Sequence, residues 1–182
     1  MNHQGTKRLE TERLILRPFA MEDARAMYQN WCADPEVTKY LPWPAYKSVE
    51  NAYEILTAWT KEYEKKDFYQ WAIVLKETGE PIGSISVVEQ KEKAKLAHIG
   101  YCLGRRWWHR GIMSETLKTV MDYLFDEVGF NRLESRHDPN NPNSGKVMVK
   151  CGMKYECTMR QSDWNNQGIC DASWYALLRE ER

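Results

Sequence analysis

The sequence predicts a mixed α/β fold, in which a central, mostly antiparallel sheet carries helices on both faces. Two strand patterns, at 69–76 and 81–89, are joined by Glu77-Thr78-Gly79-Glu80, a sequence typical of hairpin turns. Residues 95–136 alternate strand, helix and strand, and this order requires a parallel pair with a right-handed crossover. Apolar residues at helical spacing predict further helices that pack on the sheet.

Three elements are expected before the hairpin. Residues 13–18 have the apolar character of a strand, and Pro18 ends it. Apolar side chains three and four residues apart predict a helix over 24–31, whereas prolines interrupt 33–44 and favour a loop. Ser48 is suited to cap a helix over 49–63, whose apolar side chains recur on one face.

The second half of the chain contains the remaining elements. The strand at 95–103 leads through a basic loop into a helix whose apolar stripe runs from Met113 to Val128 and stops at Gly129. A strand over 131–136, a short helix from Ser144 to Cys151, and strands over 154–160 and 172–178 complete the prediction. No linker or repeat divides residues 1–182, so we expect a single domain.

Composition excludes several classes of function. The chain has 182 residues, with 26 Lys and Arg balanced by 26 Asp and Glu, so it has no overall basic field for nucleic acid or an anionic membrane. No apolar run approaches the ~20 residues of a bilayer span, and the N-terminus lacks a signal-like apolar segment. We therefore expect a cytoplasmic protein. The five cysteines and four histidines lack metal-site spacing, so no metal is expected.

The loop between strand 95–103 and the following helix predicts an anion site. The first N–H groups of a helix have no partner within it, and the helix dipole is positive there. Gly111 allows close approach of the backbone to a ligand, and Arg106 and Arg110 add positive charge. Residues 108–114 are thus expected to bind a phosphate or pyrophosphate, although spacing alone is equally compatible with a solvated basic turn. Neither a Walker loop nor a dinucleotide fingerprint is present.

Four motifs, in this order, resemble the GNAT superfamily of acetyl-CoA-dependent N-acetyltransferases. They are His98-Ile99-Gly100-Tyr101-Cys102-Leu103, Trp108-His109-Arg110-Gly111-Ile112-Met113-Ser114-Glu115, Asn141-Pro142-Asn143-Ser144 and Lys150-Cys151-Gly152-Met153. The segments Thr11–Pro18 and Asp34–Val37 are similar to the branch of Rim-type ribosomal-protein N-terminal acetyltransferases. The resemblance covers about Leu9 to Arg179. The sequence departs from the family's loop pattern, Q/R-x-x-G-x-G/A, at Trp108 and Met113.

The resemblance implies a GNAT-like sheet with a splayed parallel strand pair and acetyl-CoA as the acetyl donor, without a metal. Loop amides would bind the pyrophosphate, the strand before the loop would pair with the pantetheine arm and polarise the thioester, and Asn141 would bond the same arm. The implied cofactor-binding residues are Tyr101, Cys102, Leu103, Trp108, His109, Arg110, Gly111, Ile112, Met113, Ser114, Asn141 and Ser144.

Direct attack by a neutral amine needs a proton acceptor and a proton donor. Many relatives use a tyrosine as the acid, but the matching residue here is Met148, so Ser144 is the proposed substitute; its alternative is a helix N-cap. His98 is a candidate base because relatives often carry Glu there, and Glu89 and Glu156 are rivals at strand positions. The alternative for His98 is a structural strand residue.

The acceptor is expected to be a protein N-terminal amine or a small-molecule amine. The aromatic residues proposed to surround it are Tyr40, Trp43, Trp71 and Trp164, each of which is alternatively a packing residue. A catalytically inactive acyl-CoA-binding module is the alternative function, and stacking of nucleic acid on 105–110 is disfavoured by the neutral charge. A monomer or homodimer without nucleic-acid or membrane partners is expected.

Overall fold

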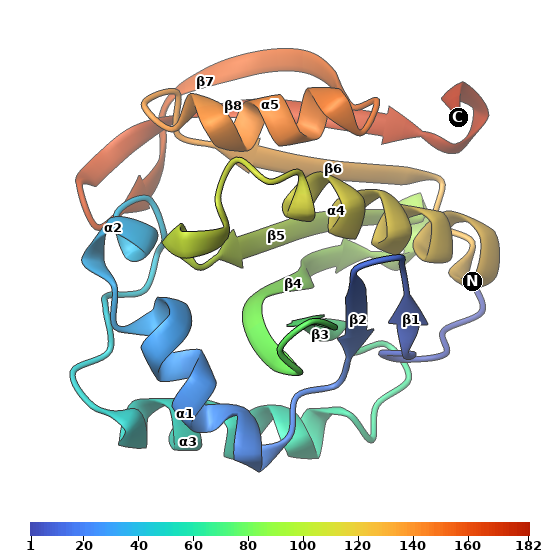
Figure 1. Ribbon diagram of the computed structural model, residues 1–182. Coiled ribbons are helices and arrows are strands. Elements are labelled where there is room, and N and C mark those ends of the chain that lie inside the picture. The colour runs from blue at the N-terminus through green and yellow to red at the C-terminus, as the bar shows by residue number, and fades with distance from the viewer.

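The computed structural model describes residues 1–182 and contains one eight-stranded sheet (Figure 1). Its strand order is β1-β2-β3-β4-β5-β6-β8-β7. The strands are β1 (Leu9–Glu10), β2 (Leu14–Arg17), β3 (Gln70–Leu75), β4 (Glu80–Lys91), β5 (Leu96–Leu103), β6 (Arg132–His137), β7 (Lys154–Asn165) and β8 (Gly168–Leu178). All neighbours are antiparallel except β5 and β6, which confirms the predicted mixed sheet.

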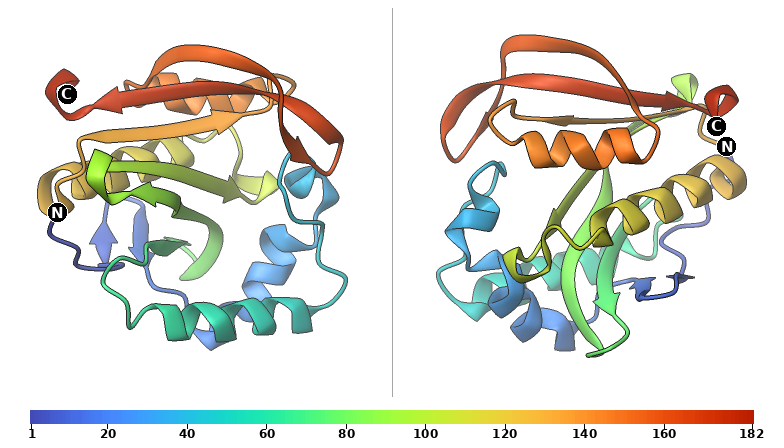
Figure 2. Two further views of the ribbon diagram at one scale, coloured as in Figure 1. Left: turned by 180° about the vertical axis from the view of Figure 1, so that it is seen from behind. Right: turned by 45° about the horizontal axis from the view of Figure 1, so that its top comes forward.

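Helices cover both faces of the sheet, as Figure 2 shows. On one face lie α1 (Ala24–Met27), α2 (Pro35–Thr38) and α3 (Val49–Glu62), and on the other α4 (Ile112–Tyr123) and α5 (Pro142–Lys150). A π-helical turn continues α1 over Tyr28–Cys32, and another continues α4 over Leu124–Val128. None of the helices has both the length and the apolarity that crossing a bilayer requires.

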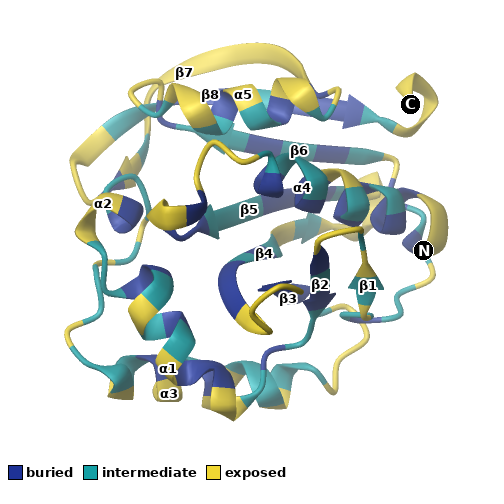
Figure 3. Cartoon of the chain, viewed as in Figure 1, coloured by how far each residue is buried: buried dark blue, intermediate teal, exposed yellow.

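Two apolar cores result, one beneath each helical layer (Figure 3). The larger includes Leu117, Val120 and Phe125, all 0% exposed, packed against sheet residues such as Ile99. The smaller lies between the sheet, α1 and α3, around Trp31 and Leu56. Full burial of each such side chain stabilises the fold by about 1.5–3 kcal/mol. The predicted apolar stripes of both long helices therefore face the sheet.

The parallel pair separates soon after it begins. β5 and β6 are in register from Leu96 opposite Arg132 to His98 opposite Glu134, and no pairing continues beyond that point. The Ser135 hydroxyl donates to the Ile99 carbonyl at 2.8 Å where the strands part. β5 runs on to Leu103 without a partner on this side, so part of its backbone faces a gap in the sheet.

Three elements differ from the sequence-based prediction. The short strand β1 was not anticipated, and residues 35–38 form a helix within the predicted loop, where Asp34 accepts from the Glu36 N–H and Pro35 starts the helix. The hairpin of the last two strands is longer than predicted, since β7 extends to Asn165 and β8 begins at Gly168. A register shift between Met159 and Asp163 breaks the alternation by which the sequence would have indicated the extension.

Candidate active site

The loop between β5 and α4 presents a run of unpaired main-chain donors. No hydrogen bond of the structure uses the N–H groups of residues 109–114; the first one bound is that of Glu115, which donates to the Gly111 carbonyl at 3.1 Å. His109 (φ 60°) and Gly111 (φ 72°) both adopt the left-handed conformation, which turns successive amides toward one side. The positive end of α4 lies at the same place, so this loop suits an anion.

The loop borders a cavity of about 390 Å³. This volume lies within the range of small-molecule sites. The cavity is lined by Val37, Tyr40, Leu41, Tyr101, Cys102, Leu103, Trp107, Trp108, His109, Arg110, Gly111, Ile112, Met113, Ser114, Asn141, Asn143, Ser144, Lys146, Val147 and Lys150. Every residue that the family resemblance implies for the cofactor therefore lines this cavity.

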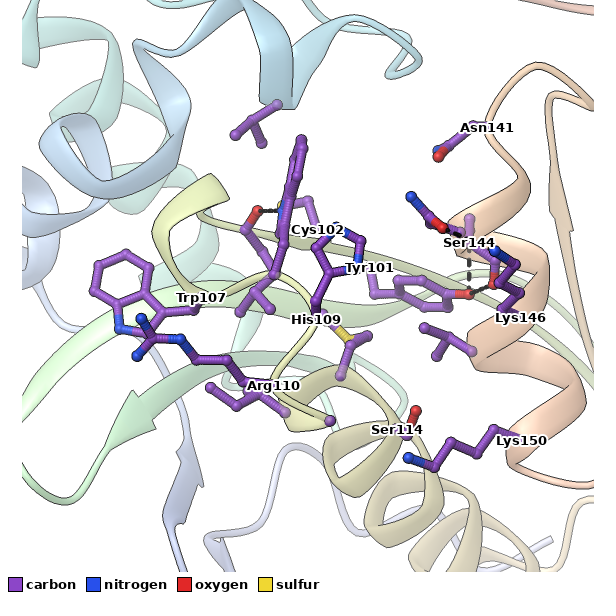
Figure 4. A pocket seen from close by; sticks show the side chains of 18 of the residues that line it. Tyr101, Cys102, Trp107, His109, Arg110, Ser114, Asn141, Ser144, Lys146 and Lys150 are labelled. Atoms are coloured by element: carbon purple, nitrogen blue, oxygen red, sulfur yellow. Dashed lines mark hydrogen bonds between the residues drawn. The ribbon is translucent and has the colours of Figure 1, made fainter.

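Basic residues line the cavity, and none of its lining residues is acidic. Figure 4 shows His109 and Arg110 on the loop side, with Lys146 and Lys150 on α5 across from them. A Cβ on Gly111 would lie 3.9 Å from the Lys150 amine, so that cation is close to the free amides. Sequence reasoning missed both lysines, although their spacing of four residues on one helix would have indicated a shared face.

The backbone hydrogen-bonding groups of β5 face alternately toward β4 and toward the gap beside β6. Ile99 and Leu103 turn their carbonyls away from β4, since they accept from Ser135 and from the Trp108 indole at 2.7 Å. Antiparallel pairing alternates, so the backbone polar groups of Tyr101 face the gap too. Cys102 differs from the expectation in its main chain, which lies opposite Ser84 in the ladder and faces β4, although the residue lines the cavity.

Ser144 and Tyr101 form a hydroxyl pair at the cavity wall. The Tyr101 hydroxyl donates to the Ser144 carbonyl at 2.9 Å and accepts from the Ser144 hydroxyl at 3.2 Å (Figure 4). Burial raises the pKa of Tyr101, which keeps the phenol protonated. Asn141 is the N-cap of α5, which begins at Pro142, so the alternative reading of Ser144 as the cap is wrong.

The geometry argues against His98 as a base. The residue is 5% exposed and is not part of the cavity lining. Its Nε2 accepts from the Arg136 guanidinium at 3.2 Å, which places the proton of the neutral ring on Nδ1. Burial, together with the Arg136 charge, lowers the pKa of His98 to about 4. Glu89, opposite His98 in the ladder, is exposed beside Lys91 and also lies outside the cavity.

Of the four proposed acceptor residues, Tyr40 lines the cavity. Trp71 is the clearest correction: it is 0% exposed in β3, and its indole donates to the Lys7 carbonyl at 2.7 Å, so it is a core residue. Trp43 packs on Tyr46, with ring centroids 5.5 Å apart, and Trp164 is 59% exposed on β7; neither lines the cavity. The strand alternation and loop positions in the sequence did not distinguish the aromatic residue that lines the cavity from those that are buried or exposed elsewhere.

The two methionines that depart from the family pattern are both buried. Met113 is 6% exposed and packs in the larger core, so its bulk has room there and its main chain stays at the loop. Met148 is 0% exposed in the same core and has no proton to donate.

Comparison with known proteins identifies the family. Residues 13–154 match the model of the acetyltransferase (GNAT) domain. The chain is 32% identical over 173 residues to "uncharacterized N-acetyltransferase p20" of Bacillus licheniformis, covering 95% of this chain and 97% of that protein. It is 24% identical to the ribosomal-protein-serine acetyltransferase of Escherichia coli, covering 92% and 94% of the two chains.

A solved structure has the same fold. The microcin C7 self-immunity acetyltransferase MccE, in complex with acetyl-CoA and AMP, superposes with a TM-score of 0.83 at 18% identity, covering 92% of this chain and 93% of that one. The family match over residues 13–154 and the 32% identical relative show that the chain belongs to the GNAT family of acetyltransferases.

Proposed function

We propose that the protein transfers the acetyl group of acetyl-CoA directly to a primary amine, either a protein N-terminal α-amine or the amine of a small molecule. The observation that carries the proposal is the continuity of the cavity, which runs from the free amides of 109–114 to Tyr40 and Leu41 on the α2 side. The ribosomal-protein acetyltransferase among the relatives supports an N-terminal amine, and the fold supports either acceptor.

The residues present fit acetyl-CoA. Loop amides and the cations Arg110, Lys146 and Lys150 suit its phosphates, and the backbone of Tyr101, facing the gap, suits the amides of its pantetheine arm. Asn141 lines the same wall and is proposed to bond that arm. Acetyl-CoA supplies an activated acyl group, whose C–S bond breaks as the C–N bond of the product forms.

Two protons move in this reaction, one off the amine and one onto the departing thiolate. We assign the second to the Ser144 hydroxyl on the cavity wall, which would turn its hydrogen from Tyr101 to the departing sulfur and take a replacement proton from solvent water. The phenol of Tyr101, protonated at neutral pH, keeps the hydroxyl in place. The cavity lining contains no carboxylate, and its one imidazole, that of His109, lies on the cofactor loop. We therefore assign the proton that leaves the amine to solvent water.

Calorimetry with CoA, followed by thiol release from acetyl-CoA, tests the proposal. The amine panel pairs each free peptide with its N-blocked form and adds a polyamine and an aminoglycoside. We expect CoA binding and thiol release that depends on a free amine. A folded protein that gives no heat with CoA would refute the assignment of the loop.

The alternative function is an acyl-CoA-binding module without catalysis, and one observation favours it: the position of the family's tyrosine acid is occupied by the buried Met148. Heat with CoA, combined with no amine-dependent thiol release across the panel, is the result that this alternative predicts.

A further inference from the structure

The tip of the β7–β8 hairpin lies against the segment that follows α2, as both Figure 1 and Figure 2 show. Asn166, in the tip, makes three hydrogen bonds to this segment. Its main-chain N–H donates to the Leu41 carbonyl at 3.2 Å, and its side-chain amide donates to the carbonyls of Thr38 and Trp43, both at 2.8 Å. One residue thus uses all three of its N–H groups on a stretch of six residues.

No other contact of this kind holds residues 38–43. Their only other hydrogen bonds are local, from the Thr38 N–H to Asp34 and from the Leu41 N–H to Thr38. The segment belongs to no strand and has no ladder to fix it. Its side chains Tyr40 and Leu41 nevertheless line the cavity. Apart from the packing of Trp43 on the smaller core, the hydrogen bonds of Asn166 are therefore what ties this wall to the rest of the protein.

The tip is itself anchored to the opposite wall. The buried Asn165 side chain donates to the Asp138 carboxylate at 2.9 Å, and its oxygen accepts the Gln167 N–H at 2.7 Å. Asp138 in turn accepts the Asn141 N–H on its carbonyl at 2.7 Å. A continuous set of hydrogen bonds consequently joins the wall of Tyr40 to the turn that carries Asn141.

We propose that Asn166 is a positioning residue that sets the acceptor side of the cavity, by holding Tyr40 and Leu41 at a fixed distance from the cofactor side. This inference rests on the proposed function, because it assigns the α2 wall to the amine. Substrate alignment is sensitive to displacements of about 1 Å. Loss of this clamp, the three hydrogen bonds of Asn166, should therefore weaken binding of the amine and leave binding of CoA unchanged.

The experiment compares Asn166→Ala and Asn166→Asp with the wild type and with Gln167→Ala. Asn166→Asp keeps the shape but removes both amide donors. Gln167 is the matched control, because it is the adjacent exposed turn residue and its side chain makes no hydrogen bond. Three quantities are measured: hydrogen exchange of peptides covering 38–43, the CoA dissociation constant by calorimetry, and KM for acetyl-CoA and for the best amine of the panel.

For both Asn166 variants we expect exchange at 38–43 to quicken and the amine KM to rise, each by about tenfold. The CoA dissociation constant and the acetyl-CoA KM should stay within about twofold, and Gln167→Ala should match the wild type. Unchanged exchange in folded variants overturns the clamp whether or not the enzyme turns over. An equal rise in both KM values overturns its selectivity for the acceptor side. Failure of the proposed function is a separate result: an absence of turnover in the wild type itself.

Discussion

The guanidinium of Arg13 forms a salt bridge with the carboxylate of Glu115 in the first turn of α4. Its Nη2 and Nε lie 2.6 and 2.8 Å from Glu115 Oε2, and its Nη1 donates to the Arg110 carbonyl at 3.0 Å. A residue just before β2 thereby fixes both the helix and the loop that presents the free amides. Burial opposes ionisation of Glu115, but the hydrogen bonds from Thr11 and Arg13 prevail and lower its pKa.

Replacing Arg13 by alanine should loosen the loop and weaken CoA binding by about fivefold to tenfold, since a charge-assisted bond to the Arg110 carbonyl is lost. Calorimetry measures the change. Arg8→Ala is the matched control, because Arg8 is exposed and paired locally with Glu10. Equal CoA affinity in the two variants would show that the loop keeps its shape without Arg13.

Ser144→Ala should lower kcat by about tenfold or more with little change in the acetyl-CoA KM, because a proton donor matters most as the thiolate departs. Ser144→Thr, which keeps the hydroxyl, should restore most of the rate. Steady-state kinetics with the best amine provide the measurement. If the alanine and threonine variants lose the same activity, the hydroxyl is not the donor.

His98 should make the protein less stable in acid. Its pKa is about 4 in the folded protein and near 6.5 when unfolded, so between these values the unfolded chain binds a proton that the native protein does not. Stability from His98 is complete above about pH 6.5 and declines toward pH 4, by about 3 kcal/mol in all. Urea unfolding at several pH values measures this, and His98→Gln should remove that part of the slope. An identical slope in the variant would contradict the buried, neutral imidazole.

Neutralising Lys146 and Lys150 together, as Lys146→Gln with Lys150→Gln, should weaken CoA binding by about tenfold and reduce its dependence on salt. Both lysines lie on α5, across the cavity from the loop that carries His109 (Figure 4). Titrations at two ionic strengths measure the effect. Lys93→Gln, at an exposed turn remote from the cavity, is the control and should bind CoA like the wild type. A variant with unaltered salt dependence would place the CoA phosphates elsewhere.

The loop and its helix were predictable because their determinants are local. Gly111, the flanking arginines and the apolar stripe of α4 occur within one stretch of sequence, and the strand–helix–strand order requires the parallel pair. The environments of Trp71 and His98 were not predictable in this way. Trp71 is buried under the N-terminal segment, where its indole donates to the Lys7 carbonyl. Burial of His98, together with the charge of Arg136, 38 residues away, lowers the pKa of the imidazole and keeps it neutral.

The Asn166 contacts were beyond sequence reasoning for the same reason. They join residues more than 120 positions apart, and two neighbouring asparagines between the predicted strands 154–160 and 172–178 give no sign of their partners. Lys146 and Lys150 are intermediate: their helical spacing is visible, but the cavity that they face forms only when α5 packs beside α4.

The early parting of β5 and β6 leaves the two halves of the sheet joined by few main-chain bonds. A ligand whose amides occupy that opening completes the ladder from both sides and acts as a surrogate strand. Binding in the opening should then stabilise the whole folded protein. At a hundredfold excess over its dissociation constant, CoA would add about 2.7 kcal/mol to the free energy of unfolding. The melting temperature of the protein should therefore rise with the fraction of molecules in which a ligand fills the opening.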